Sequence, residues 1–106
     1  MRNQVQLIGN IGIDPEITNF ENGAKKVRFT LATNERFKTK DGKEQQKTFW
    51  HNLYAWGPTA SYIAKSGKKG TQLAITGKLV SNEYQSKAGA KRKFTSIEVQ
   101  KAVALS

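Results

Sequence analysis

The sequence has no cysteine and a single histidine. The lack of cysteine excludes a disulfide framework, thiolate zinc sites and a cysteine nucleophile, and one histidine leaves little for a histidine-rich metal site. Long hydrophobic runs are also missing, since no stretch approaches the roughly 18 apolar residues of a membrane span. The N-terminal MRNQVQLIGN has no continuous hydrophobic stretch of the kind that a signal peptide needs. We therefore expect a soluble, non-secreted protein without a metal or cofactor.

Acidic residues are scarce, with 8 Asp and Glu against 18 Lys and Arg, which gives a net charge of +10. The positive excess lies in residues 36–47, 61–80 and 85–106, whereas residues 1–35 are neutral. One such stretch on its own is often a solvated loop that keeps a protein soluble. Three on a chain of this size favour a polyanionic partner, nucleic acid first and an anionic membrane surface second.

The spacing of apolar residues predicts a small all-β domain. At 106 residues and 37% apolar, the chain suffices for one domain with one modest core, residues 1–106. Period-2 alternation predicts five strands. The first begins at Val5, and the other four span about residues 26–37, 49–56, 73–84 and 94–103. Pro58 to Gly67 is typical of a short helix. Five strands with one helix between the third and fourth match a five-stranded OB-fold barrel.

Turn residues predict the connections between these strands. Asp14-Pro15 and Asn22-Gly23 bracket a loop. Two basic hairpin loops are expected, one at residues 38–47 around Asp41-Gly42 and one at 87–93 around Ala88-Gly89. Two of the basic stretches are thus expected at hairpin tips.

The most informative stretch is residues 49–56, FWHNLYAW. In a strand, Trp50, Asn52, Tyr54 and Trp56 point to one side, and the other side carries Phe49, His51, Leu53 and Ala55. The smaller Leu53 and Ala55 suit a barrel interior, which leaves the aromatic row outside. Such a row is a second core, a subunit interface or a stacking platform for unpaired bases, and the basic loops favour the last.

No catalytic motif is present. Residues 70–79 fail as a phosphate-binding loop, because six residues separate the glycines and Leu79 stands where Ser or Thr is needed. Asp14 and Glu16 are typical of a turn, and His51 has no nucleophile beside it. We therefore expect a binding module with no catalytic residues.

Several motifs, in order and spacing from about Val5 to Val99, resemble the bacterial single-stranded DNA-binding protein family. They are Leu7-Ile8-Gly9-Asn10-Ile11-Gly12, Asp14-Pro15-Glu16, Phe29-Thr30-Leu31-Ala32-Thr33-Asn34-Glu35, Trp50-His51-Asn52, Trp56-Gly57 and Gly77-Lys78-Leu79. The resemblance implies an OB-fold that coats and protects single-stranded DNA with little sequence preference in replication, recombination and repair. It also implies a homotetramer in the bacterial cytoplasm, associated with the nucleoid.

The resemblance also assigns roles to residues. Base stacking falls on Phe37, Trp50, Trp56 and Tyr84, and His51 falls in the subunit contact that supports the tetramer. The basic residues expected to contact phosphate are Arg28, Arg36, Lys38, Lys40, Lys78, Lys87, Lys91, Arg92 and Lys93.

The chain departs from the family's pattern in two places. Residues 80–83, VSNE, follow Gly77-Lys78-Leu79 where the family commonly has basic residues, so this strand end is expected to hold phosphate less well. The family's acidic C-terminal tip does not occur in these 106 residues, so no partners that dock on such a tip are expected for this chain.

Other classes of protein share parts of this pattern. A dimeric primosomal OB protein and an RNA-binding OB domain have a similar fold, but Trp50-His51 favours the single-stranded DNA-binding family. A phosphodiester-cleaving enzyme would need a clustered acidic or histidine metal site, and the sequence offers none.

Overall fold

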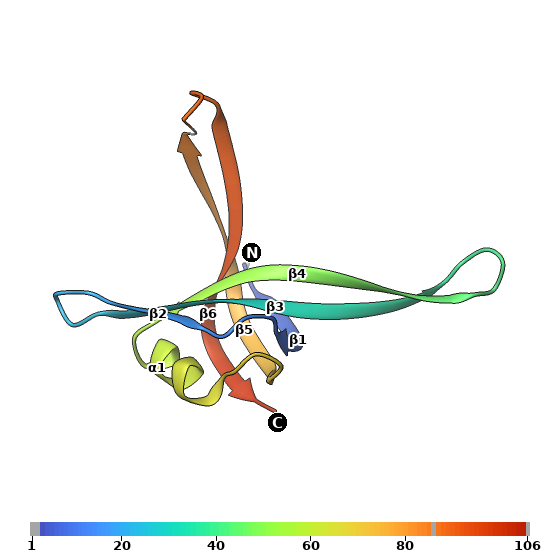
Figure 1. Ribbon diagram of the computed structural model, residues 1–106, viewed down its shortest axis with the longest axis horizontal. Coiled ribbons are helices and arrows are strands. Elements are labelled where there is room, and N and C mark those ends of the chain that lie inside the picture. The colour runs from blue at the N-terminus through green and yellow to red at the C-terminus, as the bar shows by residue number, and fades with distance from the viewer. Residues whose placement is uncertain (1–2, 86, 106) are drawn as a thin grey trace.

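The computed structural model describes residues 3–85 and 87–105, without the side chains of Asn82 and Tyr84. Six strands and one helix are formed in this part of the chain (Figure 1). In chain order they are β1 (Val5–Ile11), β2 (Glu16–Asn19), β3 (Lys25–Lys38), β4 (Glu44–Trp56), α1 (Gly57–Ser66), β5 (Gln72–Gln85) and β6 (Lys91–Ala104).

Five of the strands close into a barrel in the order β1-β5-β6-β4-β3, with β1 also pairing with β3. The pair β4–β6 is parallel, and the other pairs are antiparallel. The helix α1 lies between β4 and β5 along the chain, at one end of the barrel (Figure 1). The predicted five-stranded OB-fold with one short helix is confirmed.

The core follows the predicted alternation. Val27, Phe29 and Leu31 of β3 point inward, and so do Leu53 and Ala55 of β4. The remaining buried apolar side chains come from β1, β5, β6 and the helix, at Ile11, Leu73, Ile75, Ile97, Val99, Ala60 and Ile63. Burying a large apolar side chain stabilises the fold by about 1.5–3 kcal/mol, so this interior holds the barrel and fixes which residues of β4 face outward.

The short strand β2 corrects the prediction of a loop between Asp14 and Gly23. It pairs with the first residues of β3, from Glu16 opposite Arg28 to Asn19 opposite Lys25. All four residues of β2 are exposed. An exposed strand held by backbone pairing has no buried face and therefore leaves no apolar alternation in the sequence.

The two hairpins continue beyond the barrel as two-stranded arms, which Figure 1 shows extending in different directions. Pairing in the first runs to Lys38 opposite Glu44, and in the second to Gln85 opposite Lys91. The predicted loops at 38–47 and 87–93 were therefore too long. The outer parts of both arms are exposed on both faces and carry polar residues at positions 38–48 and 91–93, so their sequence does not distinguish them from loops.

Candidate nucleic-acid interface

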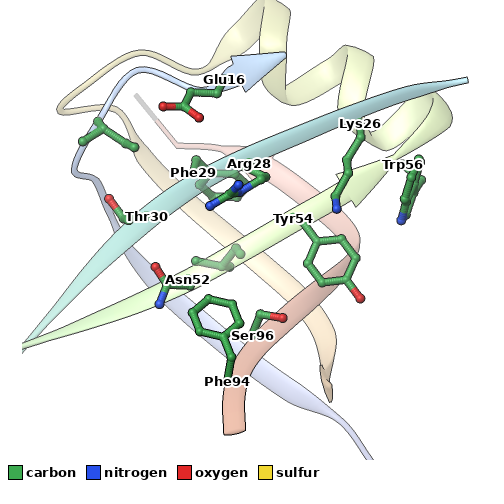
Figure 2. Close-up of a pocket in the computed structure, with 12 residues that line it drawn as sticks. Glu16, Lys26, Arg28, Phe29, Thr30, Asn52, Tyr54, Trp56, Phe94 and Ser96 are labelled. Carbon is green, nitrogen blue, oxygen red and sulfur yellow. The ribbon is translucent and has the colours of Figure 1, made fainter. Parts of the chain in front are cut away.

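A groove of about 400 Å³ lies on the outer face of the barrel over β3, β4 and β6 (Figure 2). Outward side chains of paired strands form its floor, with Lys26 opposite Trp56, Arg28 opposite Tyr54 and Thr30 opposite Asn52. Further lining comes from Ile13, Glu16, Phe94 and Ser96. Asn52, Tyr54 and Trp56 of β4 face this groove while Leu53 and Ala55 are buried in the core, as the aromatic alternation predicted.

Trp56 lies at one end of the groove and is 42% exposed. Its ring centroid is 5.6 Å from that of Phe20, with the planes tilted by 31°. The Lys26 ammonium lies 5.0 Å from the ring centroid of Tyr54 and 5.2 Å from that of Trp56. These distances are within cation–π range. An aromatic surface with a positive charge above it is thus open to solvent here.

Trp50 lies at the other end of the row and is 63% exposed. Its indole lies against Gly12, since a methyl group added to Gly12 would collide with the ring and lie 2.7 Å from Oγ1 of Thr30. A second hollow of about 220 Å³ opens beside Trp50, where β4 and β6 separate beyond the Leu53–Ile97 pair. This hollow is lined by Trp50, His51, Asn52, Leu79, Thr95, Ser96 and Ile97.

A row of polar side chains crosses the barrel beside the groove. Tyr54 of β4 pairs with Glu98 of β6, and Glu98 pairs with Lys78 of β5. The Lys78 ammonium lies 3.3 Å from Oε2 of Glu98. Burial, and then the charge of Glu98, raise the pKa of the Tyr54 phenol, which therefore stays protonated at neutral pH. Lys78, one of the residues expected to contact phosphate, is thus paired with the Glu98 carboxylate.

All of the basic residues expected to contact phosphate are exposed, but the structure distributes them over three places. Arg28 lines the groove, and Lys78 lies in the polar row beside it. Arg36, Lys38 and Lys40 lie on the β3–β4 arm, where Arg36 is 3.9 Å from Glu44. The β5–β6 arm carries Lys87, Lys91, Arg92 and Lys93. The arms carry most of these cations away from the aromatic groove.

The four residues expected to stack on bases are also divided. Trp50 and Trp56 share the outer face, whereas Phe37 pairs with Gln45 and lies on the opposite face of the β3–β4 ribbon, 45% exposed. Tyr84 lies opposite Arg92 in the other arm, and its side chain lies outside the described residues. Of the three whose side chains the structure describes, Trp50 and Trp56 share one surface and Phe37 lies on another.

His51 is half-buried at the barrel end of the β3–β4 arm. Its Nε2 lies 2.9 Å from Oγ1 of Thr33, within hydrogen-bonding distance. This contact fixes the imidazole within the protomer.

The sequence did not single out Lys26, Phe20 or Phe94 for this surface. Phe20 lies in the turn between β2 and β3, a region predicted as a loop, and the hydrogen bond from its N–H to the Ala24 carbonyl closes that turn. Phe94 of β6 is 41% exposed and lines the groove near Asn52 and Ser96 (Figure 2). The sequence signal that could have identified them is an aromatic residue at a turn for Phe20, and at the base of an arm for Phe94.

An apolar patch lies on a different part of the outer surface. Ile8 of β1 pairs with Ala74 of β5, which pairs with Val103 of β6. Ile8 is 62% exposed and Val103 56% exposed, and Leu105 beside them is 46% exposed. We call Ile8, Ala74, Val103 and Leu105 the apolar face.

The described part of the chain has neither a metal-binding cluster nor a membrane-spanning helix. Within residues 3–85 and 87–105, no three His, Asp or Glu side chains gather in a way that could hold a metal ion. The helix in the described part of the chain is too short and too polar to cross a membrane.

The model of the single-strand binding protein family matches residues 2–105 of this chain. The chain belongs to this family. Its members are DNA-binding proteins rather than enzymes, in agreement with the lack of a catalytic motif. The resemblance seen in the sequence motifs is therefore confirmed.

Two curated relatives carry the name single-stranded DNA-binding protein 1. The one from Chlorobaculum tepidum is 42% identical over 96 residues, which cover 90% of this chain and 59% of that protein. The one from Xylella fastidiosa is 38% identical over 96 residues, which cover 90% of this chain and 71% of that protein. This chain thus spans about three-fifths of the length of the first relative.

Two solved structures share the fold. The Plasmodium falciparum SSB in complex with ssDNA superposes with a TM-score of 0.91 at 25% identity, covering 100% of this chain and 97% of that one. A deletion mutant of the single-stranded DNA binding protein from Thermus aquaticus superposes with a TM-score of 0.86 at 22% identity, covering 99% of this chain and 51% of that one.

Proposed function

We propose that this chain binds and protects single-stranded DNA with little base preference, in DNA replication, recombination and repair. The observation that carries the proposal is the outer face of β3 and β4, where Trp56, Tyr54, Lys26 and Arg28 line the groove and the exposed Trp50 lines the smaller hollow beside it. The Plasmodium falciparum SSB, whose structure is similar over the whole chain, was solved in complex with ssDNA. The proposed location is the nucleoid in the bacterial cytoplasm, where such DNA is exposed.

The mechanism combines stacking with neutralisation of phosphates. Each base offers a π-face, so stacking on the two tryptophans is tolerant of sequence and contributes about 1–3 kcal/mol per base. Arg28 in the groove and the cations of the two arms supply phosphate contacts. In this proposal Phe37 and Tyr84 extend the path along the arms, and the strand passes around the β3–β4 ribbon to reach Phe37 on its opposite face. If about five phosphates are neutralised, the logarithm of affinity falls with a slope of about −3.5 against the logarithm of salt concentration.

The test is a titration of labelled single-stranded and double-stranded oligonucleotides of equal length and sequence. We expect the single strand to bind more tightly, to quench the tryptophan fluorescence, and to weaken on the order of a hundredfold between 50 and 200 mM salt. Equal affinity for the duplex, or unchanged fluorescence at saturation, would refute the proposed stacking.

We also propose that the chain forms a homotetramer in which copies meet through the apolar face. Ile8 and Val103 expose more than half of their side chains there, around a hollow of about 600 Å³. Burial of apolar surface of this kind favours association by about 25 cal/mol per Å² removed from water. The proposed role of His51 is to hold the base of the β3–β4 arm at a subunit contact.

Mass measured in solution tests this assembly. Ile8→Lys places a charge on the apolar face and should lower the mass at micromolar concentration. Ile17→Lys is the matched control, because Ile17 is 48% exposed on β2, outside the apolar face, and should leave the mass unchanged. A monomeric parent chain that still binds DNA strongly would refute the tetramer.

A further inference from the structure

Asn52 occupies the centre of the outer face. It lies between Trp50 and Tyr54 along β4, directly opposite Thr30 of β3, and it is exposed. Among the residues that the structure describes, its amide takes part in no side-chain hydrogen bond. Asn34, by contrast, accepts a hydrogen bond of 2.7 Å from the Thr48 hydroxyl. The Asn52 amide is therefore available to a bound molecule.

Asn52 also separates two hollows, each of which has an aromatic wall. The larger one, the groove of about 400 Å³, contains Tyr54, Trp56 and Phe94, and Figure 2 shows Asn52 directed into it. The smaller one, of about 220 Å³, contains Trp50. Asn52 and Ser96 line both hollows. Bases stacked in the two hollows would thus have their edges on either side of the Asn52 amide.

A primary amide suits an unpaired base of any kind. It presents one acceptor oxygen beside a donor nitrogen, and rotation by half a turn exchanges their places. The edge that each base uses for Watson–Crick pairing carries a donor next to an acceptor: the 6-amino group and N1 in adenine, the 4-amino group and N3 in cytosine, N1–H and O6 in guanine, N3–H and O4 in thymine. An amide matches all four when it can turn, and in a duplex these edges are already occupied.

We propose that Asn52 contacts the pairing edges of bases held in the two hollows, so that the chain selects unpaired bases without choosing among them. This assignment rests on the proposed function, because it requires single-stranded DNA in the groove. Asn52 and the stacking rings would then together keep the discrimination among bases low.

Asn52→Asp tests the assignment, because a carboxylate accepts hydrogen bonds but cannot donate. At its pairing edge cytosine offers it one hydrogen of the 4-amino group with a single acceptor, N3, beside it, whereas thymine offers one N–H between two carbonyls that both repel it. A bidentate base-edge contact discriminates by about 1–3 kcal/mol, and one accepted hydrogen bond is expected at the low end of that range. The ratio of oligo-dC affinity to oligo-dT affinity should therefore rise about fivefold or more over that of the unaltered chain. The ratio also cancels the general repulsion between the new charge and phosphate.

Two controls complete the experiment. Asn34→Asp adds the same charge on the β3–β4 arm and keeps the acceptor for Thr48, so it should weaken both oligonucleotides equally and leave the ratio unchanged. Asn52→Leu removes the hydrogen bonds altogether and should weaken dC and dT by similar factors. A ratio that Asn52→Asp does not move, while the chain still binds both strands, would overturn the role of Asn52 alone. An unaltered chain that binds neither strand would overturn this role together with the proposed function.

Discussion

Replacing Glu98 with glutamine should strengthen the binding of single-stranded DNA. The Glu98 carboxylate lies 3.3 Å from the Lys78 ammonium, beside Tyr54 on the surface that carries the groove. A lysine paired with a carboxylate is less available to a phosphate, and the carboxylate itself repels one. Glu98→Gln keeps the size of the side chain and removes both effects.

The expected gain follows from counterion release. Each phosphate neutralised on a single strand adds about 0.7 to the steepness of the log–log salt dependence. If Lys78 neutralises one more phosphate, affinity should rise roughly eightfold at 50 mM salt and roughly threefold at 200 mM. Because the two side chains are 45% and 30% exposed, losing the ion pair should cost the folded state only about 0.2–1 kcal/mol.

Oligo-dT titrations over a series of salt concentrations measure both the affinity and the slope. Lys78→Gln and the double variant complete a cycle, and in the Lys78→Gln background the Glu98 substitution should not steepen the slope. A weaker Glu98→Gln variant with an unchanged slope would show that Glu98 orients Lys78 toward DNA, and would refute the reasoning that it competes with phosphate.

Three further changes have defined outcomes. Trp50→Ala and Trp56→Ala should each cost about 1–3 kcal/mol of DNA binding while the chain stays folded, since neither ring belongs to the buried core; unfolding of either variant would mean that these rings belong to a core. In Gly77→Ala the added methyl group would collide with the Glu98 carbonyl of the paired strand, so urea unfolding should show a loss of about 1–3 kcal/mol, and a variant as stable as the parent would contradict this packing. In an ultraviolet titration Tyr54 should ionise above the ordinary tyrosine pKa, and a spectrum in which Tyr54→Phe removes a step at or below that value would be inconsistent with its burial.

The sequence predicted the barrel because the core residues alternate in it. Val27, Phe29 and Leu31 are buried at every second position, and this pattern identifies a strand without reference to its partners. The same alternation, continued along β3, puts Phe37 on the side opposite Trp50. The base-stacking role of Phe37 was assigned from its motif position alone, which takes no account of this.

The rest of the site depends on contacts between distant parts of the chain. Phe20 contacts Trp56 because the β2–β3 turn folds back over the barrel. The sequence does not predict this turn, because β2 has no buried face and therefore no apolar alternation. Phe94 lines the same groove as Tyr54 because β6 runs beside β4 in parallel, a pairing set by closure of the barrel. The pairing of Lys78 with Glu98 likewise depends on the register of β5 against β6.

The position of β1 also determines the order in which the chain can fold. The hairpins β3–β4 and β5–β6 join neighbouring segments, and hairpins of this kind form within microseconds. β1 instead pairs Val5 with Gly77 near the other end of the chain, and the same strand contacts β3. Closing so long a loop costs more entropy than closing a hairpin, so the docking of β1 is expected to be the slow step. Until β1 docks, β3 and β5 present unpaired edges that can pair with other chains. The docking of this seven-residue strand therefore protects the folding chain against aggregation.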